Sequence, residues 1–532
     1  MIWLLQDFDL LSVVLRALSL SLEALALGSI VFLWAVARPG IAEPTARVAV
    51  RRFAAWCALA LAVVQALATA ENCATLMSSG LAFSETASAS FFKADCVLIA
   101  TALALFLLLR YLREGLVLLA VAGTVVVFAS VMLSHAVSQL DHRALLFFLT
   151  LAHHLGAAAW IGAMPSLLIA MRRTDDAKRV RALASRFSAM AVVSVAVLVL
   201  AGIGMSYFYV GSWQGLYGTS YGVMLMAKIY LLLMTVTLGA SNFFLVRRTR
   251  SDAAPLLARL RRFSEAEIGL GFTAIVAAAS MTAQPPARDL VNDQVTGHEL
   301  VQRIEWRWPE LHSPAFSQLT HRSSLEAALE ADAYNGGAEN NAMDQAWSEY
   351  NHHWAGLIVL AAGLFAFVSR LPRQGWAGNW PLLFFALAIF IILRADPESW
   401  PLGSRSFWES FAEPEVLEHR VFAALIAAFA VFEWAIETGR LQSQRAALVF
   451  PALCALGGAL LLTHMHNLGN DDKSEMMVGL SHSAIAVLGA TAGWARWLQI
   501  RLPNRRTSRI AAWIWPVCFM LVGVILLDYR ES

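Results

Sequence analysis

Histidines gather around one apolar segment, SHAVSQLDHRALLFFLTLAHHLGAAAWIG, at residues 134–162. His135 precedes the apolar stretch, and His153 and His154 lie side by side within it. Imidazole binds copper, and the thioether of Met132, one helical turn before His135, favours Cu(I). Because a helical hairpin would bring both ends of this segment to similar depth, we expect His153 to share a metal site with His135 or Met132. His154 points about 100° away from His153 on a helix, so at most one of the two should face a given partner.

The same spacing recurs near the C-terminus. In THMHNLGNDDKSEMMVGLSH, His464 ends one apolar run and His482 begins the next, with the same separation in sequence as His135 and His153. His-X-His spacing suits two ligands in an extended segment, and thioethers lie nearby. We therefore predict a second metal-binding patch from His464, His466 and His482 with Met465, Met476 or Met477.

Other polar residues interrupt the apolar runs. Glu23 and Lys228 lie deep within them, and a lone charge there is costly. We expect these two residues to be electrostatically coupled, with proton relay as an alternative role for Glu23. Glu71 lies near the outer end of the second run, beside Cys73. Cys73 and Cys96 occupy the ends of consecutive runs, where they could form a disulfide or bind Cu(I).

The rest of the chain supplies an apolar framework for these residues. Of its 532 residues, 58% are hydrophobic and 15% are charged, whereas a soluble domain carries about 25% charged residues. Because backbone groups in lipid must be satisfied within each span, we predict an all-α polytopic bundle of about fourteen helices. The first run is interpreted as a span and not as a signal peptide. The predicted spans are 10–37, 54–78, 94–110, 115–136, 145–171, 187–210, 222–246, 266–284, 353–370, 379–394, 419–437, 448–465, 476–498 and 509–528.

Lys and Arg are concentrated in alternate loops of this map. Basic loops remain in the cytoplasm, so an even number of spans places both chain termini on the periplasmic side. All 13 histidines then fall in outer loops or near the outer ends of helices, which packing does not explain. The basic loops contain Arg47, Arg51 and Arg52; Arg172, Arg173, Lys178 and Arg179; Arg247, Arg248, Arg250, Arg261 and Arg262; and Arg501, Arg505 and Arg506.

Five stretches between residues 153 and 286 carry a family resemblance. They are HHLGAAAWIGAMP, SRFSAMAVVSVAVLVLAG, YGTSYGVMLMAKIYLLL, NFFLVRR and LRRFSEAEIGLGFTAIVAAASMTAQPP. In this order and spacing they resemble the copper-resistance D (CopD) family of bacterial inner-membrane proteins. The resemblance implies copper handling at or across that membrane, often beside a periplasmic copper carrier protein. The chain departs from the family pattern in lacking a clear Met-rich outer loop.

The resemblance also suggests a division of the chain. Residues 1–286 are expected to form a CopD-like membrane domain of eight helices. Residues 287–352 are expected to form a small periplasmic segment. Residues 353–532 would form a six-helix C-terminal membrane domain, an extension of the family pattern.

Two function classes fit these observations. There is no GxxxxGK[ST] loop, no nucleic-acid-binding feature and no CxxC motif, so we expect no nucleotide, no nucleic acid and no enzymatic activity. One class is a copper protein that takes copper from the periplasmic side and transports it or hands it on. The alternative is a membrane b-type cytochrome whose paired helical histidines ligate haem. Copper is favoured, because Met and Cys accompany the histidines and no His lies near the inner side for a second haem.

Overall fold

The computed structural model describes the chain as helices joined by turns, with one isolated β-bridge between Ser399 and Arg405. The described residues are 8–112, 115–139, 141–248, 254–314, 342–396, 399–412, 414–463, 472–502 and 505–531. They divide into two compact units. Unit 1 comprises residues 1–217, 224–292 and 462–466, and unit 2 comprises residues 218–223, 293–461 and 467–532.

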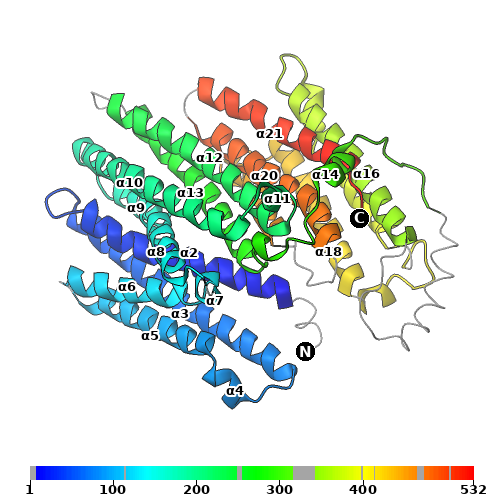
Figure 1. Ribbon diagram of the computed structural model, residues 1–532. Helices are drawn as coiled ribbons and strands as arrows, with labels where there is room; N and C mark the ends of the chain where they lie inside the picture. Colours follow the sequence, from blue (N-terminus) through cyan, green and yellow to red (C-terminus); the bar gives the residue numbers. More distant parts are fainter. Residues whose placement is uncertain are drawn as a thin grey trace. The chain divides into compact units, whose positions relative to one another are not determined.

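Unit 1 is built around the first long helix, α2, which is drawn in dark blue in Figure 1. This helix packs against α3, against the π-helical turn η1 and against α13, while α3 packs against α5 and α8 packs against α10. The helices of this unit are α2 (Phe8–Ala35), α3 (Pro44–Ser78), α4 (Phe83–Ser88), α5 (Ser90–Tyr111), α6 (Leu116–Val131), α7 (His135–Ser138), α8 (Arg143–Ala157), η1 (Ala158–Gly162), α9 (Met164–Arg172), α10 (Ala177–Val210), α11 (Trp213–Tyr217), α12 (Ser220–Arg248), which begins in residues of unit 2, and α13 (Ala254–Thr282).

The contact between α2 and η1 is a close approach of two backbones. A Cβ atom on Gly162 would lie 1.9 Å from the carbonyl oxygen of Ala24, and one on Gly28 would lie 2.3 Å from that of Ala158. Glycine is therefore required at both positions. Beside this contact, the Ser166 hydroxyl donates to the Ser29 hydroxyl at 2.9 Å. The contact fixes α2 against the segment that carries the paired histidines.

Three arginines cap helix C-termini in unit 1, and two of them, Arg51 and Arg261, belong to the predicted basic loops. Arg51 donates to the carbonyl oxygens of residues 108 and 109 at the end of α5, at 2.9 and 2.7 Å. Arg186 donates to Ala35 at the end of α2, and Arg261 donates to Met171 in the last turn of α9, each at 2.7 Å. Cations are favourable where unpaired carbonyls end a helix. Two of the residues that set the predicted orientation, Arg51 and Arg261, therefore also cap helix ends, and Arg186 caps a third at the same end of the unit.

Unit 2 has a core of large aromatic side chains. Trp380 lies 5.4 Å from Phe450 and 5.2 Å from Trp515, measured between ring centroids, and all three residues are fully buried. Around them α16 packs against α21, α20 packs against both α19 and α21, and α17 packs against α18. The helices are α14 (Gly297–Ile304), α16 (Ala342–Val368), η3 (Gly375–Asn379), α17 (Leu382–Arg394), α18 (Pro414–Glu437), α19 (Val449–Leu461), α20 (Asp472–Arg501) and α21 (Arg505–Leu527).

A capping box begins α14 in this unit. The Glu299 carboxylate accepts from the backbone N–H of Thr296 at 2.6 Å and from Lys473 at 3.1 Å. These hydrogen bonds lower the pKa of the Glu299 carboxylate to about 2, and the one from the backbone N–H of Thr296 has the largest effect. The carboxylate therefore stays ionised and paired throughout the neutral range.

The described residues contain 12 helices long and apolar enough to cross a membrane, and two shorter apolar helices at residues 117–131 and 446–461. Together these match the predicted runs one for one. The prediction of an all-α polytopic membrane protein is thereby confirmed.

Candidate functional site

A cavity of about 840 Å³ lies within unit 1. It is formed by the N-terminal parts of α2 and α5, the C-terminal parts of α3, α6 and α13, and the turn around α7. It therefore lies at the end of these helices opposite to the three arginine caps. Among its lining residues, those with ionisable or metal-binding side chains are Arg16, Glu71, Asp95, Met132, His135 and Arg143.

Met132 and His135 reach the cavity because α6 stops just before them. The helix ends at Val131, Met132 is its C-cap, and the short helix α7 begins at His135. The His135 ring donates a hydrogen bond to the backbone carbonyl of Thr282, at the end of α13. Two of the predicted copper ligands thus line one cavity, whereas His153, the third, is not among its lining residues. Their role as ligands stays a prediction.

Asp95 is the most buried carboxylate in the cavity wall, with 2% of its surface exposed. Ser19 donates to the Gln65 side-chain oxygen at 2.6 Å, and the Gln65 amide donates to Asp95 at 2.9 Å. Arg16 lies within electrostatic range of both Asp95 and Glu23. Gln65 and Arg16 are not among the residues predicted from the sequence. The available signal was a polar residue within an apolar run, the same signal that identified Glu23.

The two adjacent histidines contact different helices. The Nδ1 atom of His154 lies 3.1 Å from Glu23 Oε1, and the Ser130 hydroxyl donates to Glu23 Oε2 at 2.6 Å. His153 donates from Nδ1 to the Leu198 carbonyl at 3.1 Å, which leaves the lone pair of its ring on Nε2. That Nε2 atom lies 3.4 Å from the ammonium of Lys228.

These contacts correct the expected partner of Glu23. We expected Glu23 to pair with Lys228, but the structure pairs Glu23 with His154 and Lys228 with His153. Neighbouring residues on a helix point about 100° apart, so the His154 ring contacts Glu23 of α2 while the His153 ring contacts Lys228 of α12.

The cysteines of unit 1 are free thiols. Cys73 is buried and Cys96 is exposed, and neither forms a disulfide. The structure therefore does not show the disulfide that was one alternative for Cys73 and Cys96. The other alternative, Cu(I) binding, stays a prediction. Glu71, two residues before Cys73, lines the cavity.

The second predicted patch is only partly described. His464, Met465 and His466 lie outside the described residues. His482 lies on α20, where its ring centroid is 6.4 Å from that of His352 and 5.8 Å from that of Tyr529. Met476 is fully buried and Met477 is half-buried on the same helix.

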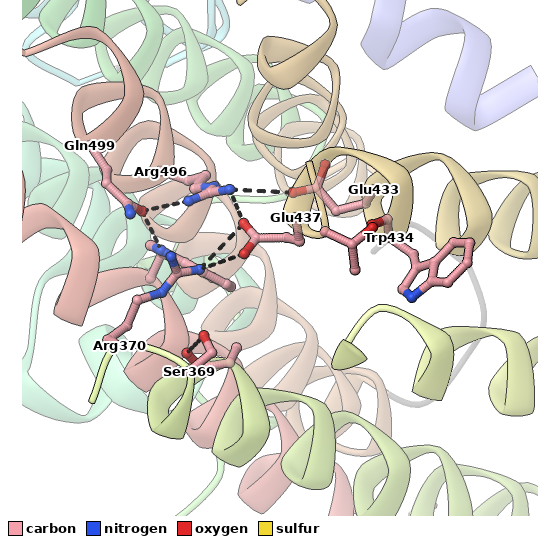
Figure 2. A network of polar contacts seen from close by, with 10 residues as sticks. Ser369, Arg370, Glu433, Trp434, Glu437, Arg496 and Gln499 are labelled. Carbon is pink, nitrogen blue, oxygen red and sulfur yellow. Dashed lines mark hydrogen bonds and ion pairs between the residues drawn. The ribbon is translucent and has the colours of Figure 1, made fainter. Parts of the chain in front are cut away.

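A separate charged network lies inside unit 2 and is shown in Figure 2. Arg496 of α20 donates to Glu437 and lies 3.5 Å from Glu433, and Arg370 lies 3.4 Å from Glu437. Gln499 accepts from Arg496 at 2.8 Å. Glu433 has none of its surface exposed. Its carboxylate and that of Glu437 lie near the C-terminal end of α18, against the guanidinium groups of Arg496 in α20 and of Arg370, which follows α16.

Within the described ranges, no group of three His, Cys, Asp or Glu side chains is arranged to hold a metal ion. A copper site formed by these residues would therefore contain at most two such side chains, or would include Met thioethers as ligands. The haem alternative needs two imidazoles that face each other across the ring of the cofactor. Both nitrogens of His153 are instead engaged by Leu198 and Lys228, so the geometry does not favour haem.

Parts of the chain are similar to known proteins. Residues 181–281, which contribute parts of α10, α12 and α13, match the family model described as Copper resistance protein D. A stretch of 136 residues is 28% identical to the Copper transport protein CutJ of Bacillus subtilis (strain 168). The match covers 25% of this chain and 24% of that protein. No solved structure matches the chain. The segment that supplies Leu198 and Lys228 to His153 thus lies within the part of the chain that matches the Copper resistance protein D model, the family that the sequence resembles.

Proposed function

We propose that this protein handles copper in the bacterial inner membrane, taking it from the periplasmic side and transporting it or handing it on. The observation that carries the proposal is the cavity in unit 1. It contains a thioether, an imidazole and two carboxylates at the helix ends that the Lys/Arg pattern assigns to the periplasm. A periplasmic copper carrier would deliver the ion to this end, and lipid would surround the helices.

The lining of the cavity suits a monovalent cation. Met132 and His135 offer the soft and borderline ligands that Cu(I) prefers. The carboxylates Glu71 and Asp95 are balanced by the guanidinium groups of Arg16 and Arg143, so the wall has no net formal charge before the ion enters. A bound Cu(I) ion would then be held by its ligands and not by a large electrostatic field.

Polar groups lead from the cavity into the helices. Arg16 interacts with both Asp95 and Glu23, and Glu23 contacts His154. The neighbouring His153 presents its Nε2 lone pair to Lys228. A copper ion that reaches His153 must displace this ammonium, because both would use the same lone pair. Lys228 would thus act as a tethered cation that keeps the deeper position closed until copper arrives.

The experiment is copper binding and uptake by the purified protein. Met132→Ala and His135→Ala should each lower Cu(I) affinity about tenfold or more, and should slow uptake into proteoliposomes. His142→Asn is the matched control, because His142 is exposed, lies outside the cavity lining and has a positive φ of 54° that Asn tolerates. Unchanged affinity and uptake in both cavity variants would overturn the proposal. A Soret band in the absorption spectrum would favour haem instead.

A further inference from the structure

A buried carboxyl group of α13 is held by an amide and not by a cation. Glu267 has 3% of its surface exposed, and its Oε1 atom accepts a hydrogen bond from the side-chain amide of Asn242 in α12, which is 6% exposed. Its Oε2 atom lies 3.3 Å from the place that a Cβ atom on Gly239 would take, so this glycine makes room for the carboxyl group. Among the residues that the structure describes, Asn242 is the one polar partner of Glu267.

No charged group that the structure describes neutralises this carboxyl group. Helix α13 packs against α2, η1 and α9, and Asn242 and Gly239 bring α12 against it. The described charged side chains of these elements are engaged elsewhere, and η1 contains none. A lone carboxylate charge is costly in an apolar interior, and a proton removes that cost. The other partners are Asp95 and Glu23 for Arg16, His154 for Glu23, Glu265 for Arg172, His153 for Lys228, the ring of Phe243 for Arg247, the ring of Phe263 for Arg259, Met171 for Arg261 and Glu265 for Arg262.

The Asn242 amide can satisfy Glu267 in both protonation states. Its Nδ2 atom donates to the carboxylate, as in the structure, whereas its Oδ1 atom is able to accept from the O–H of a carboxylic acid. A flip of the amide exchanges these two atoms, so either form of Glu267 finds a partner at the same contact. Within the described part of the chain, Oδ1 is buried without a hydrogen bond, and a proton on Glu267 is a donor that would satisfy it.

Glu265, two residues earlier in α13, provides a contrast. Its carboxylate accepts from Arg262 and lies 3.7 Å from Arg172. A guanidinium group only donates, so these partners favour the ionised carboxylate over the acid. An ion pair thus fixes the charge of Glu265, whereas the amide beside Glu267 permits the charge to change.

Glu267 lies between the arginine caps and the cavity along α13. Arg261, which caps α9, is six residues earlier, or about 9 Å along the helix. Thr282, which lines the cavity, is fifteen residues later, or about 22 Å along the helix. The Lys/Arg pattern assigns the arginine end to the cytoplasm, so the carboxyl group is nearer to that side. The same helix forms part of the cavity wall at its other end.

We propose that Glu267, positioned by Asn242, is a proton-binding site of unit 1 that exchanges its proton with the cytoplasmic side when copper crosses the unit. The proton leaves the carboxyl oxygen for water on that side, and the carboxylate left behind accepts from the Asn242 amide. A passing Cu(I) ion brings the positive charge that favours this release. The link to copper rests on the proposed function, whereas the protonated state rests on the burial of Glu267, its amide partner and the engagement of nearby charges elsewhere.

Infrared spectroscopy of the full-length protein in detergent at neutral pH tests the protonated state without copper. A protonated carboxyl group has a carbonyl stretching band that a carboxylate lacks. Glu267→Gln should remove one such band, and Asn242→Leu should shift it to higher frequency because the carboxyl group loses its hydrogen bond. Glu265→Gln is the matched control and should leave the band unchanged. Thermal unfolding checks that each variant is folded, and a Glu267→Gln spectrum that keeps every band of the wild type would overturn the site.

Copper uptake into right-side-out membrane vesicles tests the exchange, because their lumen is the cytoplasmic side. With the outer pH held constant, uptake by the wild type should fall by up to about tenfold for each unit by which the lumen pH is lowered, as expected for one proton. Glu267→Gln, which has no proton to release, should slow uptake and remove this dependence. Glu267→Asp should keep the dependence with a shifted midpoint, and Glu265→Gln should keep it unchanged.

Two results would overturn the exchange of protons. They are a wild-type uptake that does not respond to the lumen pH, and a Glu267→Gln variant that retains the wild-type response. Failure of the proposed function is distinct, because it appears as an unchanged copper affinity when Met132 or His135 is replaced.

Discussion

At the scale of single residues, the adjacent His153 and His154 determine how buried charge is arranged in unit 1. His154 contacts Glu23 and His153 contacts Lys228, so neither of these charged side chains lies alone in the apolar interior. An unpaired buried charge is costly, and each pairing reduces that cost. The two rings therefore stabilise the bundle as well as offering nitrogen ligands.

A double-mutant cycle tests this arrangement. Glu23→Gln and His154→Phe, singly and together, should show an interaction energy of roughly 0.5–3 kcal/mol in unfolding experiments in detergent, because the side chains are in contact. The cycle of Glu23→Gln with Lys228→Met is the comparison and should give a smaller value. If the second cycle gave the larger value, the direct pairing of Glu23 with His154 would be wrong.

At the scale of elements, close backbone contact sets the position of the paired histidines. The π-helical turn η1 follows α8 and brings Gly162 against Ala24, while Gly28 faces Ala158. A π-helical turn inside a longer helix shifts the register of the residues that follow, and such turns often occur at functional sites. The sequence AAWIGAMP therefore fixes α2, and with it Glu23, beside His154.

Gly162→Ala should destabilise the protein by about 1–3 kcal/mol or more, since the added methyl group overlaps backbone atoms of α2. The measurement is thermal or chemical unfolding in detergent. Gly457→Ala is the control, because Gly457 lies in α19 with open space where its Cβ would be. That change should be neutral or should stabilise the helix by up to about 1 kcal/mol. Equal effects of the two substitutions would contradict the close contact.

At the scale of the whole molecule, orientation rests on alternating basic loops and on the number of crossings. Two helices of this count are short, because α6 has 16 residues and α19 has 13. At 1.5 Å per residue both are shorter than the hydrocarbon core of about 30 Å, so each would need neighbouring residues to complete its crossing. If either did not cross, every later loop would change sides.

Cysteine labelling tests this topology. In a cysteine-free background, Ser79→Cys, Gln139→Cys and Ser313→Cys should react with a membrane-impermeant maleimide from the periplasmic side. Gly40→Cys and Gln442→Cys should react only after the membrane is permeabilised. Ser79 and Gln139 precede and follow the pair of helices α5 and α6. Labelling of one but not the other in intact cells would show that α6 does not cross.

The sequence alone determined the features that depend on composition along one helix. Long apolar runs predicted the helices, because lipid requires each span to satisfy its own backbone. The sequence also predicted a metal site of His153 with His135 or Met132; Met132 and His135 both line the cavity, His153 does not, and the site stays a prediction. These properties are local, so the hydropathy of one segment, or the order of a few residues within it, is enough to predict them.

The tertiary structure decided which helices meet, and thereby which side chains become partners. His154 and not Lys228 contacts Glu23, Gln65 and Arg16 join Asp95, and His352 lies beside His482. Each polar residue in an apolar run needs a partner, but several candidates have the same chemistry and similar depth. The choice among them depends on the crossing and rotation of packed helices, set by contacts such as that between Gly162 and Ala24, and not on the order of residues within any one helix.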